Sequence, residues 1–285
     1  MKSIRIVTDS TADIPLSVRQ ELNIEMVPLK IHFGSDDYLD AVTLQSEQFY
    51  DKLKTSSHFP KTSQPSPAEF LDVYQKLLEE PDTEVISIHL SAALSGTYQS
   101  ALLASTMLEE SVGSVHVVDS RSASYGIGAL VVAAAKAAKA GQSAEQILQL
   151  IQTMRANFYI YFLVDTLEFL HKGGRIGKAS ALFGSLLNIK PILSLDNAGE
   201  VTAIEKVRGH KKAIARILEL LGVEVAGRSI QTLHIAHANN LEGAEQLREV
   251  IMQNFTVEHV DYITLGPVIG AHAGPGTIAA FVSTV

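Results

Sequence analysis

The sequence predicts an α/β protein of two lobes, a parallel-sheet α/β lobe over residues 1–160 and a mixed α+β lobe over residues 161–285. The chain has 285 residues, which is more than one small core usually organises. In the first half, β-branched runs alternate with helical segments, a pattern typical of a parallel sheet covered on both faces. Three strands are predicted at Ile4–Ser10, Glu84–Ser91 and Ser114–Ser120.

Residues 61–70, KTSQPSPAEF, carry the signals of a helix start between the first two of these strands. Ser66 is a suitable N-cap, Pro67 suits the first helical position, and Glu69 completes a capping box. Thr62 and Ser63 are therefore expected in extended backbone just before a helix N-terminus.

A second hydroxyl-bearing segment, HLSAALSGTYQSA, runs from His89 to Ala101 between the end of a predicted strand and the start of a helix. Hydroxyls near a helix N-terminus can bind an anion, because the first turn presents free N–H groups. The simpler interpretation is that Ser95 only caps the helix at 97–107. Ligands of parallel sheets bind at the carboxyl ends of the strands, where these segments converge.

The second half predicts a mixed lobe. Asn197–Gly199 suits the turn of a hairpin, and a glycine-punctuated helical stretch is expected over 171–191. The remaining expected elements are strands at 229–238, 257–266 and 275–282 and a helix at Leu241–Asn254.

Composition excludes several classes of function. The formal charge of -8 disfavours nucleic acid, which attracts basic proteins. No apolar run is long enough for a membrane helix, so no membrane insertion is expected. The N-terminus enters a strand without a signal-peptide pattern, so a cytoplasmic location is expected. The chain has no cysteine, which removes thiolate catalysis and cysteine zinc sites.

Individual residues give weak support to catalysis or metal binding. The segment around Ser95 lacks the lysine and first glycine of a P-loop and the glycines of a hydrolase elbow. Asp9 and Asp119 lack a third ligand at metal spacing, so turn and capping roles are expected, and no metal is predicted. His234 and His237 fall on opposite faces of a predicted strand and are interpreted as structural.

Motifs along the whole chain resemble the bacterial DegV family. They are VTDSTADIP at 7–15, KTSQPSP at 61–67, LSGTYQSA at 94–101, VDSRSAS at 118–124, LEFLHKGGRIGKA at 167–179, NIKPIL at 188–193 and GPVIGAHAGPG at 266–276. The resemblance implies a DegV-type, or EDD-like, fold with a Rossmann-like first lobe. It also implies a protein that binds one long-chain fatty acid and has no catalysis of its own. Family members similar to this chain act as binding subunits of a fatty acid kinase, whose catalytic subunit makes the acyl-phosphate.

Carried onto matching positions, the resemblance implies that Thr62, Ser95 and the backbone of Gly96 bind the carboxylate, with His272 in the same polar cluster. His272 is expected in a loop between Gly270 and Gly274. Further positions considered for the rim of the pocket are Ser63, Ser120 and Ser124. The apolar segments expected to wall a tunnel for the acyl chain are 125–130, 158–163 and 181–187.

Two arginines are the candidates for contact with the kinase or the acyl-phosphate. Residues 161–216 contain nine basic and five acidic side chains in an otherwise acidic chain, which is also what a solvated basic face would show. The resemblance places functional arginines at Arg175 and Arg208, both expected at the surface. The alternative function is a hydrolase or phosphotransferase that uses Ser95 with His272, which would require the two side chains within hydrogen-bond reach.

Overall fold

The computed structural model describes residues 2–109, 113–184 and 189–285. The chain forms two compact units, one of Met1–Leu44 with Pro60–Ala156 and one of Gln45–Phe59 with Asn157–Val285. The change of unit at Ala156 lies close to the predicted boundary at residue 160. Residues 45–59 leave the first unit and belong to the second.

The first unit is built on a four-stranded parallel sheet with the order β2-β1-β6-β7. Its strands are β1 (Ser3–Asp9), β2 (Ile24–Val27), β6 (Thr83–His89) and β7 (Ser114–Asp119). A small antiparallel sheet with the order β4-β3-β5 adds β3 (Lys30–Phe33), β4 (Asp36–Leu39) and β5 (Lys61–Ser63). The predicted parallel sheet is therefore present, and the small sheet was not predicted.

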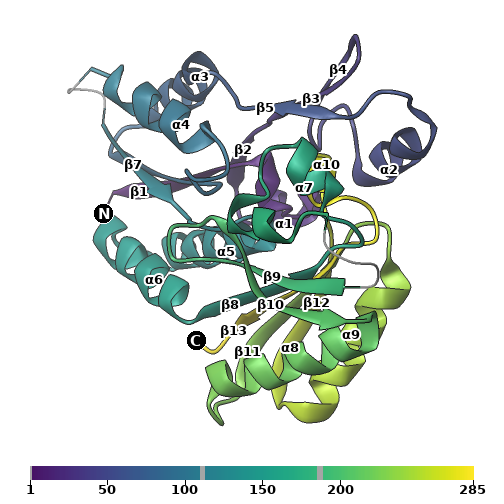
Figure 1. Cartoon of the computed structure of the whole chain (residues 1–285). Coiled ribbons are helices and arrows are strands. Elements are labelled where there is room, and N and C mark those ends of the chain that lie inside the picture. The colour runs from purple at the N-terminus through teal and green to yellow at the C-terminus, as the bar shows by residue number, and fades with distance from the viewer. Residues whose placement is uncertain (1, 110–112, 185–188) are drawn as a thin grey trace. The chain divides into compact units, whose positions relative to one another are not determined.

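Helices cover both faces of the parallel sheet (Figure 1). The helices of this unit are α1 (Leu16–Glu21), α3 (Pro67–Leu78), α4 (Thr97–Thr106), α5 (Tyr125–Lys139) and α6 (Ala144–Ala156), with a 3-10 turn η1 (Ser10–Ala12). On one face, Phe70 and Tyr74 of α3 and Ala101 of α4 pack on Val7 and Val85. On the other face lies α5, whose alanine- and glycine-rich surface allows close approach to β1 and β6.

The helix start predicted at residues 61–70 is confirmed. Ser66 Oγ accepts the amide of Glu69, and the Glu69 carboxylate accepts the amide of Ser66 at 2.8 Å. Pro67 occupies the first helical position, where its missing N–H costs nothing. This capping box fixes where α3 begins and leaves Thr62 and Ser63 in β5 just before it.

The second unit contains a six-stranded mixed sheet with the order β10-β9-β8-β13-β11-β12, in which β11 and β12 are parallel and the other pairs antiparallel. The strands are β8 (Phe158–Leu163), β9 (Ile189–Leu195), β10 (Val201–Arg208), β11 (Ile230–His237), β12 (Val257–Thr264) and β13 (Ile278–Ser283). The helices are α2 (Ser46–Thr55), α7 (Glu168–Lys172), α8 (His210–Val225), α9 (Leu241–Asn254) and α10 (Pro267–Ala273), with a 3-10 turn η2 (Gly177–Leu182).

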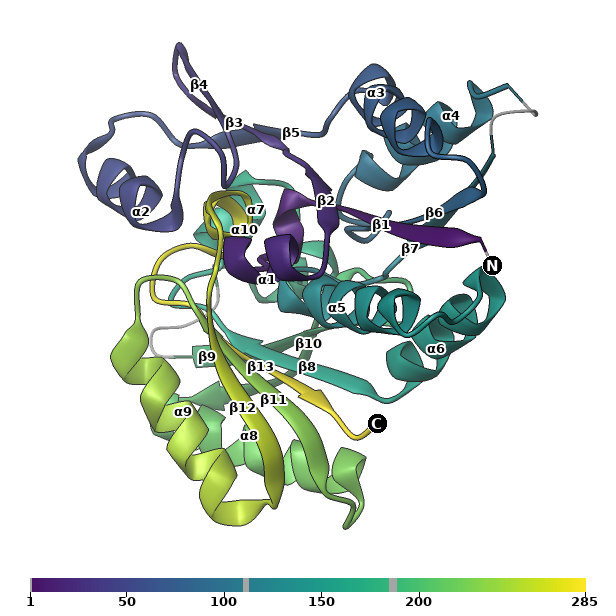
Figure 2. The same ribbon diagram turned by 180° about the vertical axis from the view of Figure 1, so that it is seen from behind.

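Helices α8 and α9 pack on one face of this sheet, as Figure 2 shows. Ile217 and Leu221 of α8 and Leu247 of α9 are fully buried in this core. The predicted hairpin is confirmed, with Gly199 at a φ of 78° in its turn. The stretch predicted as helical over 171–191 instead holds, among its described residues, the end of α7, the turn η2 and the first residues of β9. Gly174 and Gly177 adopt positive φ, which interrupts a helix. Within the described part of the chain, no helix is long and apolar enough to cross a membrane.

Candidate functional site

The loops that follow the parallel strands of the first unit are tied together at the carboxyl end of the sheet. The Asp9 carboxylate, at the end of β1, accepts the amide of Leu90 after β6 at 3.0 Å. The amide of Ser91 donates to the carbonyl of Ser122 after β7 at 2.9 Å. The three loops therefore form one ordered rim.

Asp9 and Asp119 have the turn and capping roles expected from the sequence. Asp9 caps η1 by accepting the amide of Thr11 at 3.0 Å. Asp119 accepts the amides of Ala92 at 3.2 Å and Arg121 at 2.9 Å. The described residues contain no group of three His, Asp or Glu side chains arranged to hold a metal ion.

Beneath the rim lies a fully buried chain of polar side chains. The Tyr74 hydroxyl donates to Ser87 Oγ at 2.8 Å, Ser87 Oγ lies 2.6 Å from Nε2 of His89, and Nδ1 of His89 lies 3.0 Å from the Asp9 carboxylate. Burial raises the pKa of Tyr74, which keeps the phenol protonated as a donor. The order Ser–His–Asp resembles a catalytic triad, but all four side chains are inaccessible, so the chain of bonds supports the rim instead of meeting a substrate.

Ser95 and Gly96 stand at the N-terminus of α4. Gly96 is the N-cap residue, and α4 begins without a side-chain cap at that position and without an acidic residue in its first turn. Ser95 Oγ accepts the amide of Thr97 at 3.3 Å and lies 2.9 Å from the Thr97 hydroxyl. The helix N-terminus therefore presents a hydroxyl pair and backbone amides together, which is an arrangement suited to an anion.

The segment with Thr62 and Ser63 meets this helix N-terminus through Gln64. A Cβ at Gly96 would lie 2.2 Å from Oε1 of Gln64, so the Gln64 amide lies directly against the glycine. Gln64 Nε2 also donates to Ser100 Oγ of α4 at 3.0 Å. The structure thus brings the two predicted hydroxyl segments together in one unit. Gln64 was not predicted from the sequence. The signal that could have indicated it is Gly96, because a glycine leaves room for a neighbouring side chain.

The other hydroxyls proposed for the pocket rim make internal contacts. Ser63 Oγ lies 2.9 Å from Nε2 of His32. Ser120 Oγ accepts the amide of Ser122 at 3.1 Å. Ser124 is buried at a positive φ of 52°, and its hydroxyl donates to the Asp13 carboxylate at 2.5 Å. These bonds give the three serines a role in loop structure, and their contact with a ligand stays a prediction.

In the second unit, His272 lies against the segment that carries Gly173 and Arg175. A Cβ at Gly173 would lie only 2.2 Å from Nδ1 of His272, so glycine is what makes room for the ring. Arg175 donates through Nη1 to the carbonyl of Gly173 at 2.6 Å. Burial, and then the nearby Arg175 charge, lower the pKa of His272 to about 4, so the imidazole is neutral at neutral pH.

Two expectations about this cluster were wrong. His272 lies in α10 and not in a loop, because Pro267 at the first position starts a helix that continues to Ala273. Arg175 is partly buried and not displayed at the surface. Arg208, in contrast, is exposed at the end of β10 as expected.

His234 and His237 lie on β11, where His234 is buried. Burial lowers the pKa of His234 to about 4, although Asp261, 3.6 Å away, opposes the shift. An unfolded histidine titrates near 6.5, so the stabilisation from neutral His234 is complete above that pH and is lost as the pH falls toward 4. Chemical denaturation should show the second unit losing on the order of 3 kcal/mol from this histidine over that window.

A His234→Gln variant should have a flatter dependence of the unfolding free energy on pH, by up to one proton. His259→Gln, at an exposed position of the neighbouring β12, is the matched control and should keep the wild-type slope. An unchanged slope in His234→Gln would show that His234 does not titrate between the folded and unfolded states.

The chain is a two-unit α/β protein. One unit has a parallel sheet whose hydroxyl-bearing loops are hydrogen-bonded to one another, and the other unit has a mixed sheet. Comparison with known proteins identifies the family. The model of the family described as "Uncharacterised protein, DegV family" matches residues 3–285. The chain belongs to the DegV family.

Relatives and solved structures match over nearly the full chain. A DegV domain-containing protein of Halalkalibacterium halodurans is 41% identical over 280 residues, which cover 98% of this chain and 97% of the relative. A DegV family protein from Thermus thermophilus, described by its fatty acid binding, has a TM-score of 0.92 and 38% identity with complete coverage of both chains. DegV from Bacillus subtilis, described as a fatty acid binding protein, has a TM-score of 0.89 and 36% identity, covering 99% of this chain and 100% of DegV.

Proposed function

We propose that this protein binds a long-chain fatty acid and presents its carboxylate to a partner kinase for conversion to an acyl-phosphate, in the cytoplasm. The observation that carries the proposal is the contact of Gln64, two residues after Thr62, with Gly96 and Ser100 at the start of α4, next to Ser95. Relatives above 30% identity with the same fold, from Thermus thermophilus, Bacillus subtilis and Thermotoga maritima, are described as binding fatty acid or lipid.

The proposed head-group site uses neutral donors. The hydroxyls of Thr62 and Ser95 and the backbone amide of Gly96 stabilise a carboxylate by hydrogen bonds, and the positive end of the α4 dipole adds to this. No lysine or arginine is needed, so the carboxylate stays available for transfer of a phosphoryl group. His272, which the resemblance places with the carboxylate ligands, belongs to the second unit and is neutral at its lowered pKa, and its contact with the ligand stays a prediction.

The acyl chain supplies most of the gross binding energy in this proposal. Each methylene removed from water contributes about 0.8 kcal/mol, so a long chain contributes on the order of 10 kcal/mol before the costs of binding. Residues 125–130 of α5 are all buried, and 158–163 form β8. Both remain proposed wall segments, whereas the segment 181–187 falls partly outside the described residues.

The alternative, an enzyme with Ser95 as nucleophile, has less support. The described bonds of the Ser95 hydroxyl go to the hydroxyl and amide of Thr97, neither of which is a base that takes a proton from serine at neutral pH. A hydrolase would need Ser95 oriented toward a histidine, in turn held by a third group.

We expect Thr62→Ala and Ser95→Ala each to weaken fatty acid binding by about 1–3 kcal/mol, because each removes a hydrogen bond to a charged group in a dry site. Calorimetric titration of delipidated protein measures the effect. Ser105→Ala on the same helix α4, where the hydroxyl donates to the carbonyl of Leu102, is the matched control and should bind normally. Unchanged affinity in both test variants would reject the head-group site.

A further inference from the structure

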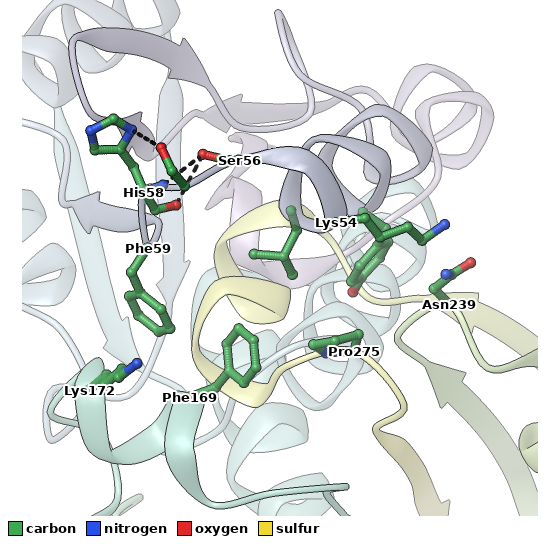
Figure 3. Close-up of a pocket in the computed structure, with 11 residues that line it drawn as sticks. Lys54, Ser56, His58, Phe59, Phe169, Lys172, Asn239 and Pro275 are labelled. Carbon is green, nitrogen blue, oxygen red and sulfur yellow. Dashed lines mark hydrogen bonds between the residues drawn. The ribbon is translucent and has the colours of Figure 1, made fainter.

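The second unit contains a pocket of about 320 Å³ that the proposed function does not use (Figure 3). Three parts of the unit surround it. They are α2 together with the segment that follows α2, the helix α7, and the turn after α10. The residues that line it are Tyr50, Leu53, Lys54, Ser56, Ser57, His58, Phe59, Phe169, Lys172, Asn239 and Pro275. All of these belong to the second unit, so the pocket is complete within it.

The inner wall of the pocket is apolar and aromatic. The rings of Phe59 and Phe169 lie 5.3 Å apart between centroids with their planes tilted by 37°, and Leu53 and Pro275 complete the wall. The segment that carries Phe59 is ordered by Ser56, whose Oγ accepts the amide of His58 at 3.0 Å. A flat apolar group fits such a surface, because aromatic rings pack well face to face when offset and edge to face.

The charged groups of the lining are all cationic. Lys54 and Lys172 line the pocket, and no Asp or Glu is found among its described lining residues, although the chain carries a charge of -8. The Lys172 ammonium lies 5.3 Å from the centroid of the Phe59 ring. Figure 3 shows the two side chains next to each other. The pocket therefore combines apolar walls with positive charge at its edge.

Each lysine also pairs with a carboxylate of its own helix. Lys54 lies 3.0 Å from Asp51, and Lys172 lies 2.6 Å from Glu168. All four side chains are exposed, and ion pairs of this kind are weak. An ammonium group has three N–H donors, so each lysine can contact a second anion without giving up the first.

We propose that this pocket is a second ligand site, for a small anion with a flat apolar body, of the class of aromatic carboxylates. Its volume lies within the range of small-molecule sites, and its mixture of apolar walls with a few polar groups is typical of them. The body would lie against Phe59 and Phe169, and the carboxylate would face Lys54 or Lys172. This ligand is distinct from the long-chain fatty acid.

The pocket adjoins the segments that contact His272. A Cβ at Gly274 would lie 2.6 Å from the ring of Phe169, so this ring stands between the pocket and the turn that follows α10. The carbonyl of Phe169 also accepts the amide of Gly173, which contacts His272. The second ligand would therefore contact the same elements that place His272.

Ligand-observed NMR and calorimetry with naphthoate as the probe test this site, using the full chain as purified and again after addition of a long-chain fatty acid. We expect saturable binding of naphthoate in both cases and much weaker binding of naphthamide, its neutral isostere. The double variant Lys54→Gln, Lys172→Gln should bind naphthoate about fivefold more weakly, as expected for two exposed charges. The matched control, Lys206→Gln with Lys212→Gln, changes two exposed lysines of the same unit outside the pocket and should bind as the wild type does.

Three results would overturn the proposal. They are no saturable binding at millimolar naphthoate, equal binding of the amide and the acid, and displacement of naphthoate by the fatty acid, which would make the pocket part of the lipid site. A failure to bind fatty acid with normal binding of naphthoate would reject the proposed function alone.

Discussion

Gly173→Ala should displace the side chain of His272 while leaving the structure of the first unit unchanged. The new Cβ would lie 2.2 Å from Nδ1 of His272 and 3.0 Å from the carbonyl oxygen of Phe169, so the ring must move. Overpacking of this kind costs about 1–3 kcal/mol of stability. If His272 and the carbonyl that holds Arg175 position the head group, then acyl-phosphate formation with the partner kinase should fall by about tenfold to a hundredfold, as displacements near 1 Å can produce.

The neighbouring glycine provides the control. Gly174 has a positive φ of 72°, and beyond its two chain neighbours no residue lies within 4 Å of a Cβ built on it. Gly174→Ala therefore costs about 1–2 kcal/mol through the backbone alone and does not displace His272. Comparable loss of activity in both variants at matched folded fractions would show that the position of His272 does not account for the loss.

Arg175→Ala and Arg208→Ala should separate fatty acid binding from transfer. The proposed carboxylate donors Thr62, Ser95 and the amide of Gly96 are neutral and lie in the first unit, so fatty acid affinity should change little in either variant. If the arginines contact the kinase or the acyl-phosphate, phosphorylation should fall at least about tenfold, because guanidinium suits phosphate and a lost charged contact at an interface costs about 2 kcal/mol or more. The effect should be larger for partly buried Arg175 than for exposed Arg208.

A coupled assay of acyl-phosphate formation, run beside a direct lipid-binding assay, measures both quantities. Lys178→Ala is a suitable control because this exposed lysine of the same basic segment pairs with Asp196. Equal losses of binding and transfer would place the arginines in the lipid site. No loss in either assay would return both arginines to an ordinary solvated face.

Local signals in the sequence predicted much of the fold. The box of Ser66 with Glu69 and the proline between them determine the start of α3 through short-range bonds. The hairpin around Gly199 and the helix Leu241–Asn254 were also predicted, since turn chemistry and helical periodicity are encoded within a few residues.

Features that depend on distant partners were not predictable. The assignment of residues 45–59 to the second unit depends on bonds such as that from Tyr50 to the carbonyl of Leu265, which no local pattern shows. Likewise, Gln64 against Gly96 and His272 against Gly173 are close approaches between segments far apart in the sequence. The resemblance to the DegV family identified the family correctly but implied nothing about the pocket beside Phe169.

The measurement that tests the proposed function most directly is native mass spectrometry of the purified protein, followed by denaturing extraction and identification of the released lipid. The proposed function predicts one long-chain fatty acid per chain in the wild type. It predicts a largely empty chain in the double variant Thr62→Ala, Ser95→Ala, which lacks both hydroxyls. A wild-type protein that is empty as purified and remains empty after incubation with long-chain fatty acids would contradict the proposal.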